Sequence, residues 1–392
     1  MNPVTIDITA PNSGPLSGVI VADFSRVLAG PYCTMILGDL GATVIKVESP
    51  TGDDTRAWTP PAYQGGACYY QAVNRNKHSI TLDFGDADDL AVAKDIAARA
   101  DVFIHNFKPG SIDKFGLGYA RVKEIKPDII YAHISGFGTS GAGAALPGYD
   151  VLVQGMAGLM DMNGEADGEP VRSGVSIFDL TTGMMTAVGI TAALRHKERT
   201  GEGQLIENNL MANAIFTMAN QYQVASTTGK HPSRNGKEHP TIYPYNAFPT
   251  ADGDLIVVAG NNGQFARLCQ VLDTPELLTD ERFDNPEKRN VNRAELRPLL
   301  ERALSTKGKD EWFGLLRAAG LPCSPVQNVS EGLESARELG IDPIWHTEDP
   351  ESMPTVRSSL SMSATPASYR KEPPQLGEDS EAVRAWLQQT QD

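Results

Sequence analysis

The sequence predicts an α/β protein with a large domain built on an open parallel sheet and a smaller, mostly helical α/β domain. Strand-like and helix-like runs alternate up to about residue 135, a pattern that favours parallel βαβ units. At 392 residues the chain exceeds the length at which one hydrophobic core usually stops growing. Composition also changes at residues 227–244, which are polar, rich in Gly and Pro and poor in helix formers.

The large domain is expected to begin with residues 1–226. Its first βαβ unit combines a β-rich run at 18–24, helical spacing of apolar residues over 30–42 and a strand at 43–48, which implies a right-handed crossover. The later elements complete an open, doubly wound and therefore Rossmann-like sheet: strands 78–84, 101–107 and 128–135, with helices 86–100 and 119–127.

The rest of the chain extends this sheet and then forms the smaller domain. Residues 170–194 are typical of a buried strand turning into a long helix, which should end near Gly201 and Gly203. A strand and a helix follow. The small domain, residues 227–329 with its linkers, contains a strand at 253–260 and amphipathic helices at 265–272, 293–304 and 309–320. Residues 330–392 are too short for a domain and should return to the large one, ending in a helix at 379–389.

Charge and composition restrict the classes of function. A formal net charge of −15 disfavours nonspecific binding to nucleic acid or anionic membrane. Residues 1–14 show no signal-peptide pattern, and no run reaches the ~18 apolar residues of a membrane span, so we expect a cytoplasmic protein. The four cysteines lie far apart and the seven histidines form no cluster, which predicts reduced thiols and no metal site.

The loop "GFGTSG" at 136–141 matches the dinucleotide-binding pattern G-x-G-x-x-G. Such a site also needs a helix that begins at the last glycine. Pro147 and Gly148 interrupt the residues that follow. An ordinary glycine-rich loop is the favoured interpretation, and an NAD(P)-dependent oxidoreductase is the alternative.

Asp179 stands out because it places a carboxylate in an apolar stretch, where an unpaired buried charge is costly. The ordinary explanation is that it caps the helix that follows, since Asp is a preferred N-cap residue. Arg26, Lys77, Lys108 and Lys114 lie at or near predicted strand ends, where open α/β sheets bind ligands. Solvated turns with scattered cations explain the same pattern.

The chain resembles the class III CoA-transferases, the formyl-CoA and carnitine CoA-transferase family, from about residue 18 to the "PPQLGED" near the C-terminus. The matching segments are "VADFSRVLAGPYCTMILGDLGATVIKVE", "NRNKHSITLDF", "DVFIHNFKPGSIDKFGLGY", "PGYDVLVQGMAGLM", "GVSIFDLTTG" and "GNNGQFARLCQVL". "VSIFDLTTG", "IYPYNAF" and "AGNNGQF" are most similar to dicarboxylate members such as the succinyl-CoA:glutarate CoA-transferases. The resemblance implies an interlocked homodimer that uses acyl-CoA and a small carboxylic acid as substrates. It also implies that coenzyme A is a substrate and that no cofactor is permanently bound.

The resemblance places the family's nucleophilic aspartate at Asp179. It implies CoA transfer from an acyl-CoA, with succinyl-CoA the expected donor, through an aspartyl-acyl anhydride and an aspartyl-CoA thioester. Covalent catalysis of this kind divides one difficult transfer into easier steps. A helix N-terminus would favour the ionised carboxylate, so the capping and nucleophilic roles are compatible.

Other site residues are implied position by position. The implied CoA contacts are Arg26, Leu28, Ala29, Leu82, Asp83, Asn106, Phe107, Lys108 and Lys114. Substrate and lid positions are Tyr149, Asp150, Gly260, Asn261, Asn262, Gly263 and Gln264. A closing lid is expected because the intermediates must be kept from water. The chain has Gly85 and Ser49 where the formyl-CoA members carry a lysine and an arginine near the nucleotide, and asparagines where some members have only glycine in the lid.

A 2-methylacyl-CoA racemase on the same fold is a further alternative. The histidine of those racemases falls at Tyr149, and a phenol with a pKa of about 10 is a poor base near neutral pH. A non-catalytic acyl-CoA-binding relative would be expected to lack Asp179. These comparisons favour CoA transfer between carboxylic acids.

Overall fold

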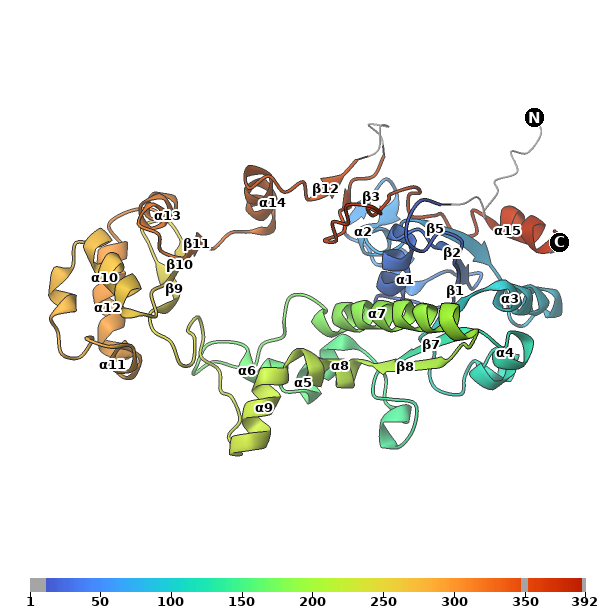
Figure 1. Cartoon of the computed structure of the whole chain (residues 1–392), viewed down its shortest axis with the longest axis horizontal. Helices are drawn as coiled ribbons and strands as arrows, with labels where there is room; N and C mark the ends of the chain where they lie inside the picture. Colours follow the sequence, from blue (N-terminus) through green and yellow to red (C-terminus); the bar gives the residue numbers. More distant parts are fainter. Residues whose placement is uncertain (1–11, 347–351, 390–392) are drawn as a thin grey trace. The chain divides into compact units, whose positions relative to one another are not determined.

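The computed structural model describes residues 12–346 and 352–389, which form two compact units (Figure 1). Unit 1 comprises the chain up to Leu159, Arg172–His231 and the segment from Asp342. Unit 2 comprises Met160–Val171 and Pro232–Ile341. Residues 160–171, which the sequence suggested for the large domain, thus belong to unit 2. The first eleven residues, on which the signal-peptide interpretation rests, lie outside the described residues.

A six-stranded parallel sheet forms the centre of unit 1, in the order β5-β2-β1-β6-β7-β8. Its strands are β1 (Ile20–Asp23), β2 (Thr43–Glu48), β5 (Lys77–Thr81), β6 (Val102–His105), β7 (Ile130–Ser135) and β8 (Leu205–Asn209). From β1 the chain adds β2 and β5 on one side, and it then adds β6, β7 and β8 on the other side. The strand order therefore reverses between β1 and β6, as in doubly wound folds. The predicted α/β class with a parallel sheet is therefore confirmed.

Helices cover both faces of this sheet. On one face, Ile96 of α3, Val122 of α4 and Trp386 of α15 pack into a buried cluster with Phe103 of β6. On the other, α1 and α7 run close together. The helices of unit 1 are α1 (Ala29–Asp39), α2 (Cys68–Gln71), α3 (Ala87–Arg99), α4 (Tyr119–Ile125), α5 (Asp150–Met156), α7 (Ile177–Thr200), α8 (Leu210–Thr217), α9 (Ala219–Thr228) and α15 (Ser380–Gln388), while α6 (Leu159–Met162) lies at the boundary between units.

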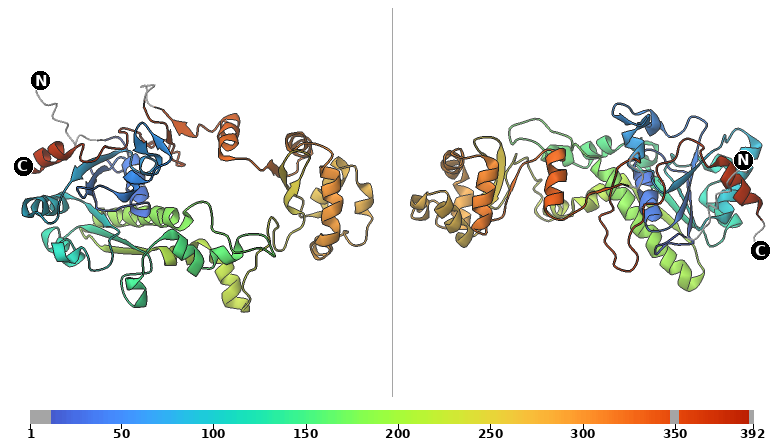
Figure 2. Two further views of the ribbon diagram at one scale, coloured as in Figure 1. Left: turned by 180° about the vertical axis from the view of Figure 1, so that it is seen from behind. Right: turned by 90° about the horizontal axis from the view of Figure 1, so that it is seen from above.

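Helix α7 is the long element that carries Asp179 (Figures 1 and 2). It ends at Gly201, whose φ of 77° is left-handed, as the sequence predicts. The strand expected at 170–176 is absent, because Pro170 and Gly174 interrupt the run and no neighbouring strand pairs with it. By length and composition α7 is able to cross a membrane, yet Phe178 and Ile190 are fully buried within unit 1, as in the core helix of a globular unit.

Unit 2 is built on an antiparallel sheet in the order β11-β10-β9. Its core contains Phe248, Leu255, Phe265 and Trp312. The predicted strand and three amphipathic helices are present, whereas β9, β11, α11 and α14 were not predicted. The elements are β9 (Tyr245–Pro249), β10 (Asp254–Val258), β11 (Cys323–Pro325), α10 (Asn262–Val271), α11 (Pro286–Val291), α12 (Arg293–Leu304), α13 (Lys309–Ala318) and α14 (Val329–Glu338).

The remaining elements are short. They are the hairpins β3 (Ala62–Tyr63) with β4 (Gly66–Ala67) and β12 (Ile344–Trp345) with β13 (Thr355–Val356). Single 3-10 turns lie at η1 (Asp54–Ala57), η2 (Asp113–Phe115), η3 (Ala142–Ala145) and η4 (Pro275–Leu278).

Candidate active site

The carboxyl ends of β1 and β6 meet at the point where the strand order reverses. Asn106, directly after β6, exchanges two hydrogen bonds with the backbone of Arg26 after β1. The Arg26 N–H donates to Asn106 Oδ1 at 2.9 Å, and Asn106 Nδ2 donates to the Arg26 carbonyl at 2.7 Å. The Arg26 guanidinium lies 5.6 Å from the centre of the Phe107 ring. Doubly wound sheets bind their ligands at this edge.

Two cavities open beside this junction, and Phe107 lines both. The first has a volume of about 80 Å³ and is lined by these predicted residues: Ala29, Asn106, Phe107, Lys108 and Asp179. The second has a volume of about 280 Å³ and is lined by Arg26, Leu82, Asp83 and Phe107, together with Ser49 and Gly85. The structure therefore brings most of the implied CoA contacts to one edge of the sheet and places Asp179 among them.

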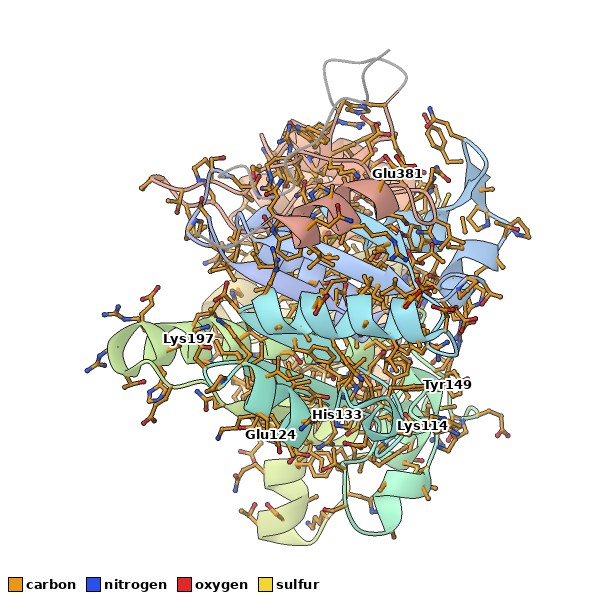
Figure 3. All side chains as sticks on the ribbon, turned by 90° about the vertical axis from the view of Figure 1, so that its right-hand side faces the viewer. Lys114, Glu124, His133, Tyr149, Lys197 and Glu381 are labelled. Atoms are coloured by element: carbon orange, nitrogen blue, oxygen red, sulfur yellow. The ribbon has the colours of Figure 1, made fainter. Side chains whose placement is uncertain are left out.

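The strand-end Lys77 lines neither cavity, because its ammonium is fully buried and donates to Asp23 Oδ2 at 3.2 Å. Four residues of unit 1 that the resemblance implies also lie outside the walls of these cavities. Leu28 is 8% exposed and packs against Met35 and Val73. The Lys114 ammonium lies 5.1 Å from the ring centre of Phe115, which lines the second cavity. Tyr149 is 60% exposed and precedes α5. Figure 3 shows where Lys114 and Tyr149 stand on unit 1. The fourth residue, Asp150, contacts the helix that carries Asp179.

Asp179 lies in the first turn of α7, after the N-cap residue Ser176. The carboxylate that binds the free amides of this turn belongs to Asp150, whose Oδ1 accepts the N–H of Phe178 at 2.8 Å and that of Asp179 at 3.2 Å. The capping interpretation of Asp179 is therefore wrong, because a side chain from α5 already satisfies these amides. Within the described ranges, the Asp179 carboxylate itself accepts no hydrogen bond.

The surroundings of Asp179 disfavour its charged form. Burial raises its pKa to about 7, and the negative charge of Asp150 acts in the same direction. Near neutral pH the side chain is thus divided between acid and carboxylate. The carboxylate that forms is partly buried and accepts no hydrogen bond from the described residues, both of which suit a nucleophile.

Tyr69 is a neighbour of Asp179 that the sequence gave no reason to select. Burial and the Asp179 carboxylate both raise the pKa of its phenol, so the two side chains interact. The ring packs against the apolar cluster of Leu28, Met35 and Val73, and Trp58 meets it edge-on at 5.0 Å between ring centres. The local sequence "GGACYYQA" contains no motif that would have identified this position.

The loop at 136–141 does not begin a helix of the kind a dinucleotide site needs. It leads into the single 3-10 turn η3, and Gly138 and Gly141 hold left-handed φ values of 96° and 68°. Gly136 and Phe137 instead line the cavity that contains Asp179. The interpretation as a glycine-rich loop agrees with this geometry.

The predicted lid residues lie at the junction of β10 and α10 in unit 2, where Gly260 and Asn261 precede the helix and Asn262, Gly263 and Gln264 form its first turn. Asn261 Oδ1 accepts the Gln264 N–H at 2.8 Å, and Gln264 Oε1 accepts the Asn261 N–H at 3.3 Å, a reciprocal capping box. Asn262 Oδ1 accepts a hydrogen bond of 2.9 Å from Arg289. The polar side chains of this segment thus stabilise unit 2. Gly260 has no room for a side chain, because a Cβ there would lie 2.6 Å from Ile242 Cγ2, whereas Gly263 is exposed.

Among residues 12–346 and 352–389, His, Cys, Asp and Glu side chains form no group of three or more that is arranged to hold a metal ion. Cys33 and Cys269 are buried free thiols, and Cys68 and Cys323 are partly buried ones.

Comparison with known proteins identifies the family of the chain. Residues 16–380 match CoA-transferase family III. A succinate–glutarate CoA-transferase of Agrobacterium fabrum is 39% identical over 95% of this chain and 96% of its own length. An acetyl-CoA:oxalate CoA-transferase of Acetobacter aceti is 40% identical over 81% and 82%. The crystal structure of a CAIB/BAIF family protein from Brucella suis has a TM-score of 0.89 and 40% identity, and covers 96% of this chain and 100% of its own. The chain therefore belongs to CoA-transferase family III, the class III enzymes that transfer CoA between an acyl-CoA and a carboxylic acid.

Proposed function

We propose that the enzyme moves CoA from succinyl-CoA, or another dicarboxylyl-CoA, to a free carboxylic acid, with Asp179 as the covalent nucleophile. One observation carries this proposal. Asp179 is partly buried, accepts no hydrogen bond from the described residues, has a pKa of about 7 and lines the same cavity as Asn106 and Lys108. A structural carboxylate would be expected to be paired or hydrogen-bonded.

The reaction needs no second nucleophile from the protein. A carboxylate oxygen of Asp179 attacks the thioester carbonyl, and the C–S bond breaks to release CoA thiolate and leave an aspartyl-acyl anhydride. The thiolate attacks the aspartyl carbonyl and releases the donor acid, which leaves an aspartyl-CoA thioester. The acceptor carboxylate then repeats these steps in reverse and regenerates Asp179. No proton is gained or lost over the cycle.

The preference for dicarboxylates rests on chemistry and on relatives. The Agrobacterium fabrum enzyme is named for succinate and glutarate, both dicarboxylates. The Acetobacter aceti enzyme is named for oxalate, also a dicarboxylate, together with acetyl-CoA, the thioester of a monocarboxylic acid. Acceptors differ among these enzymes, so the acid is best found by screening.

CoA is proposed to lie along the carboxyl edge of the sheet. Its phosphates carry negative charge, and the chain has a net charge of −15, so binding needs local cations. Arg26, whose side chain is 48% exposed, and Lys108 stand at the two cavities. Lys114 lies beside Phe115 at the second cavity. The turn at 260–264 is proposed to close over the acyl group as a lid.

A homodimer is part of the same proposal. Large apolar side chains on α5, α7 and α8 are exposed in the single chain, including Met156 at 60%, Val188 at 57% and Phe216 at 67%. Contiguous exposed apolar surface usually marks an interface, and these helices contact one another. Analytical ultracentrifugation should give twice the mass of one chain. A monomer at micromolar concentration would contradict this part.

The covalent mechanism is tested by trapping. Wild-type protein is incubated with succinyl-CoA and then with hydroxylamine, which converts an aspartyl thioester or anhydride into a stable hydroxamate. Intact mass spectrometry and peptide mapping should place the mass gain on Asp179. The gain should be absent in Asp179→Ala and retained in Asp88→Ala, which removes an exposed first-turn aspartate of α3. A gain that survives in Asp179→Ala would refute the assignment.

A further inference from the structure

The turn that joins β1 to α1 is held by side chains. The Ser25 N–H donates to Asp23 Oδ1 at 2.9 Å, and the Arg26 N–H donates to Asn106 as described above. The Val27 N–H donates to the Asp53 carboxylate, at 3.3 Å to Oδ1 and 3.2 Å to Oδ2. Since buried backbone groups require partners, the conformation of this turn depends on these three side chains.

Val27 adopts a conformation that its side chain disfavours. Its φ is 70°, in the left-handed region where a β-branched residue is an outlier. Such backbone strain persists only where the surroundings enforce it. The bond to Asp53 is the contact that holds the Val27 amide in this orientation.

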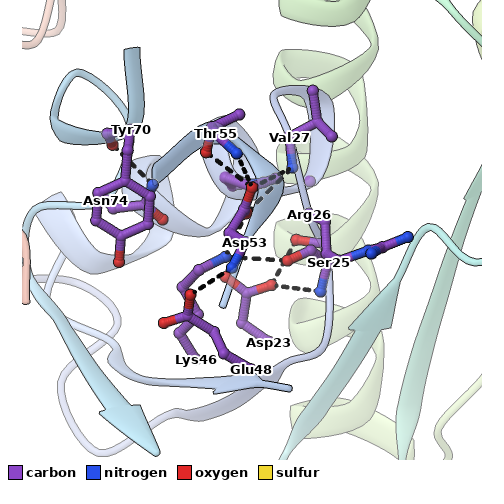
Figure 4. Close-up of polar contacts among 12 residues, drawn as sticks. Asp23, Ser25, Arg26, Val27, Lys46, Glu48, Asp53, Thr55, Tyr70 and Asn74 are labelled. Atoms are coloured by element: carbon purple, nitrogen blue, oxygen red, sulfur yellow. Dashed lines mark hydrogen bonds and ion pairs between the residues drawn. The ribbon is translucent and has the colours of Figure 1, made fainter. Parts of the chain in front are cut away.

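Asp53 is itself fixed by a buried ion pair (Figure 4). Lys46 Nζ donates to Asp53 Oδ2 and to the Ser25 carbonyl, both at 3.0 Å. Lys46 is 0% exposed and Asp53 is 2% exposed. Thr55 donates its N–H and hydroxyl to Asp53 Oδ1, and Glu48 Oε1 accepts the Asp53 N–H. A buried pair with its partners satisfied in this way is rigid, whereas loss of one member is costly.

This cluster lies between the two sides of the proposed site. On one side, Arg26 extends toward Phe107 and the larger cavity, away from the buried pair in Figure 4. On the other side, Val27 packs in a small apolar cluster with Tyr69 and Leu180, the residue that follows Asp179. The backbone of the turn therefore sets the positions of both a proposed CoA contact and an apolar neighbour of the nucleophile.

We propose that Asp53, paired with the buried Lys46, is a positioning residue for CoA binding. It holds Val27 in the left-handed conformation, and this orients Arg26 toward the ligand and seats Val27 beside Tyr69. The inference rests on the proposed function, which places CoA at this edge of the sheet.

The test compares Asp53→Asn with Asp39→Asn. Asp39 is a matched control because it is 2% exposed and paired with a cation, Arg75, at 2.6 Å, but it makes no bond to the turn. Hydrogen exchange of the peptide containing residues 25–27, without ligand, measures the anchoring. Calorimetric titration with free CoA, and KM for succinyl-CoA against KM for glutarate, measure its effect on binding.

Asp53→Asn should speed exchange in the turn, weaken CoA binding and raise KM for succinyl-CoA, each about tenfold, because a bond to a charged acceptor is lost. KM for glutarate should not change. Asp39→Asn should lower thermal stability without these effects. In a Val27→Gly background, the effect of Asp53→Asn should shrink to less than about threefold, since glycine adopts a left-handed backbone without an anchor.

Two results would overturn the proposal. If Asp53→Asn shows the same hydrogen-exchange rate in the turn and the same affinity for CoA as wild type, Asp53 does not position the turn. An effect that stays undiminished in the Val27→Gly background would show that Asp53 acts on CoA directly. If wild-type protein binds no CoA while Asp53→Asn still loosens the turn, the CoA site under the proposed function is wrong and the anchoring is upheld.

Discussion

Replacing Asp179 by Asn should abolish transfer and, above neutral pH, make the protein more stable. The folded chain must ionise Asp179 in a partly buried place next to Asp150, whereas the unfolded chain ionises it in water. The amide of Asn has nearly the same shape and carries no charge. The charged nucleophile is thus expected to lower the stability of the folded protein, as functional sites often do.

The magnitude follows from the pKa. The value rises from 3.8 to about 7, and each unit corresponds to about 1.4 kcal/mol, which gives ~4 kcal/mol as an upper bound. Because the folded-state pKa is raised, the penalty is absent below about pH 4, grows between pH 4 and pH 7, and is constant at higher pH. Solvent that reaches the partly exposed carboxylate reduces it, so we expect a gain of ~2–4 kcal/mol at pH 8.

Thermal unfolding of wild type and Asp179→Asn at pH 5.5, 7 and 8.5 tests this expectation. A gain of ~2–4 kcal/mol corresponds to an increase in Tm of about 4–8 °C at the highest pH, and the increase should be smaller at pH 5.5. Asp88→Asn, at the exposed first turn of α3, should give no pH-dependent gain. A Tm difference that is constant or falls with pH would refute the electrostatic reasoning.

Three further expectations concern the same unit. The value of kcat/KM should rise with pH through about 7 as Asp179 ionises, and Asp150→Asn should move this limb to lower pH because a neighbouring negative charge is removed; an unchanged profile would contradict this. Gly183→Ala should destabilise by about 1–3 kcal/mol in thermal unfolding, since its Cβ would lie 2.6 Å from the Ala29 carbonyl oxygen, whereas Gly189→Ala on the same helix meets only Ile206 at 3.5 Å and should be neutral or stabilising. The stacked rings of His105 and His133 lie 4.1 Å apart, and burial lowers the pKa of both. Stability should therefore fall as the pH drops below about 6.5, the pKa of histidine in the unfolded chain. In His105→Phe, the decrease in Tm between pH 7 and pH 5 should be smaller than in wild type.

Periodic patterns predicted most elements of unit 1. The strands β1, β2, β5, β6 and β7 and the helices α1, α3 and α4 have clear apolar spacing, so sequence alone located them within a few residues. The short elements β3, β4 and α2 were not predicted. The run at 170–176, before Asp179, was wrongly predicted as a strand. Residues with β propensity form a strand only beside a partner strand, and the sheet offers none there. Helix α5 was missed because its seven residues are too few to show a helical period. Helix α14 was missed although Val329, Leu333 and Ala336 recur at helical spacing after the N-cap residue Asn328.

The site was less accessible to sequence reasoning than the fold. The position of Arg26 at a strand end selected it, and the family resemblance added Asn106, but their reciprocal bonds join residues 80 positions apart. The cap of α7 comes from Asp150, 29 residues before the amide that it binds, so the local preference of Asp for N-caps pointed to the wrong aspartate. Tyr69 and the anchoring role of Asp53 are set by tertiary contacts alone.

The return of the chain to unit 1 after Ile341 has a consequence for biosynthesis. Val383 and Trp386 of α15 complete the cluster against α3, and Arg99 donates hydrogen bonds to the carbonyls of Trp386 and Leu387. During synthesis on the ribosome, this face of the sheet therefore stays incompletely covered until α15 has been made. Unit 2 is contiguous apart from a twelve-residue segment, Met160–Val171, and its residues are all synthesised earlier. We expect the early-made sheet to be the part of the newborn chain that chaperones bind.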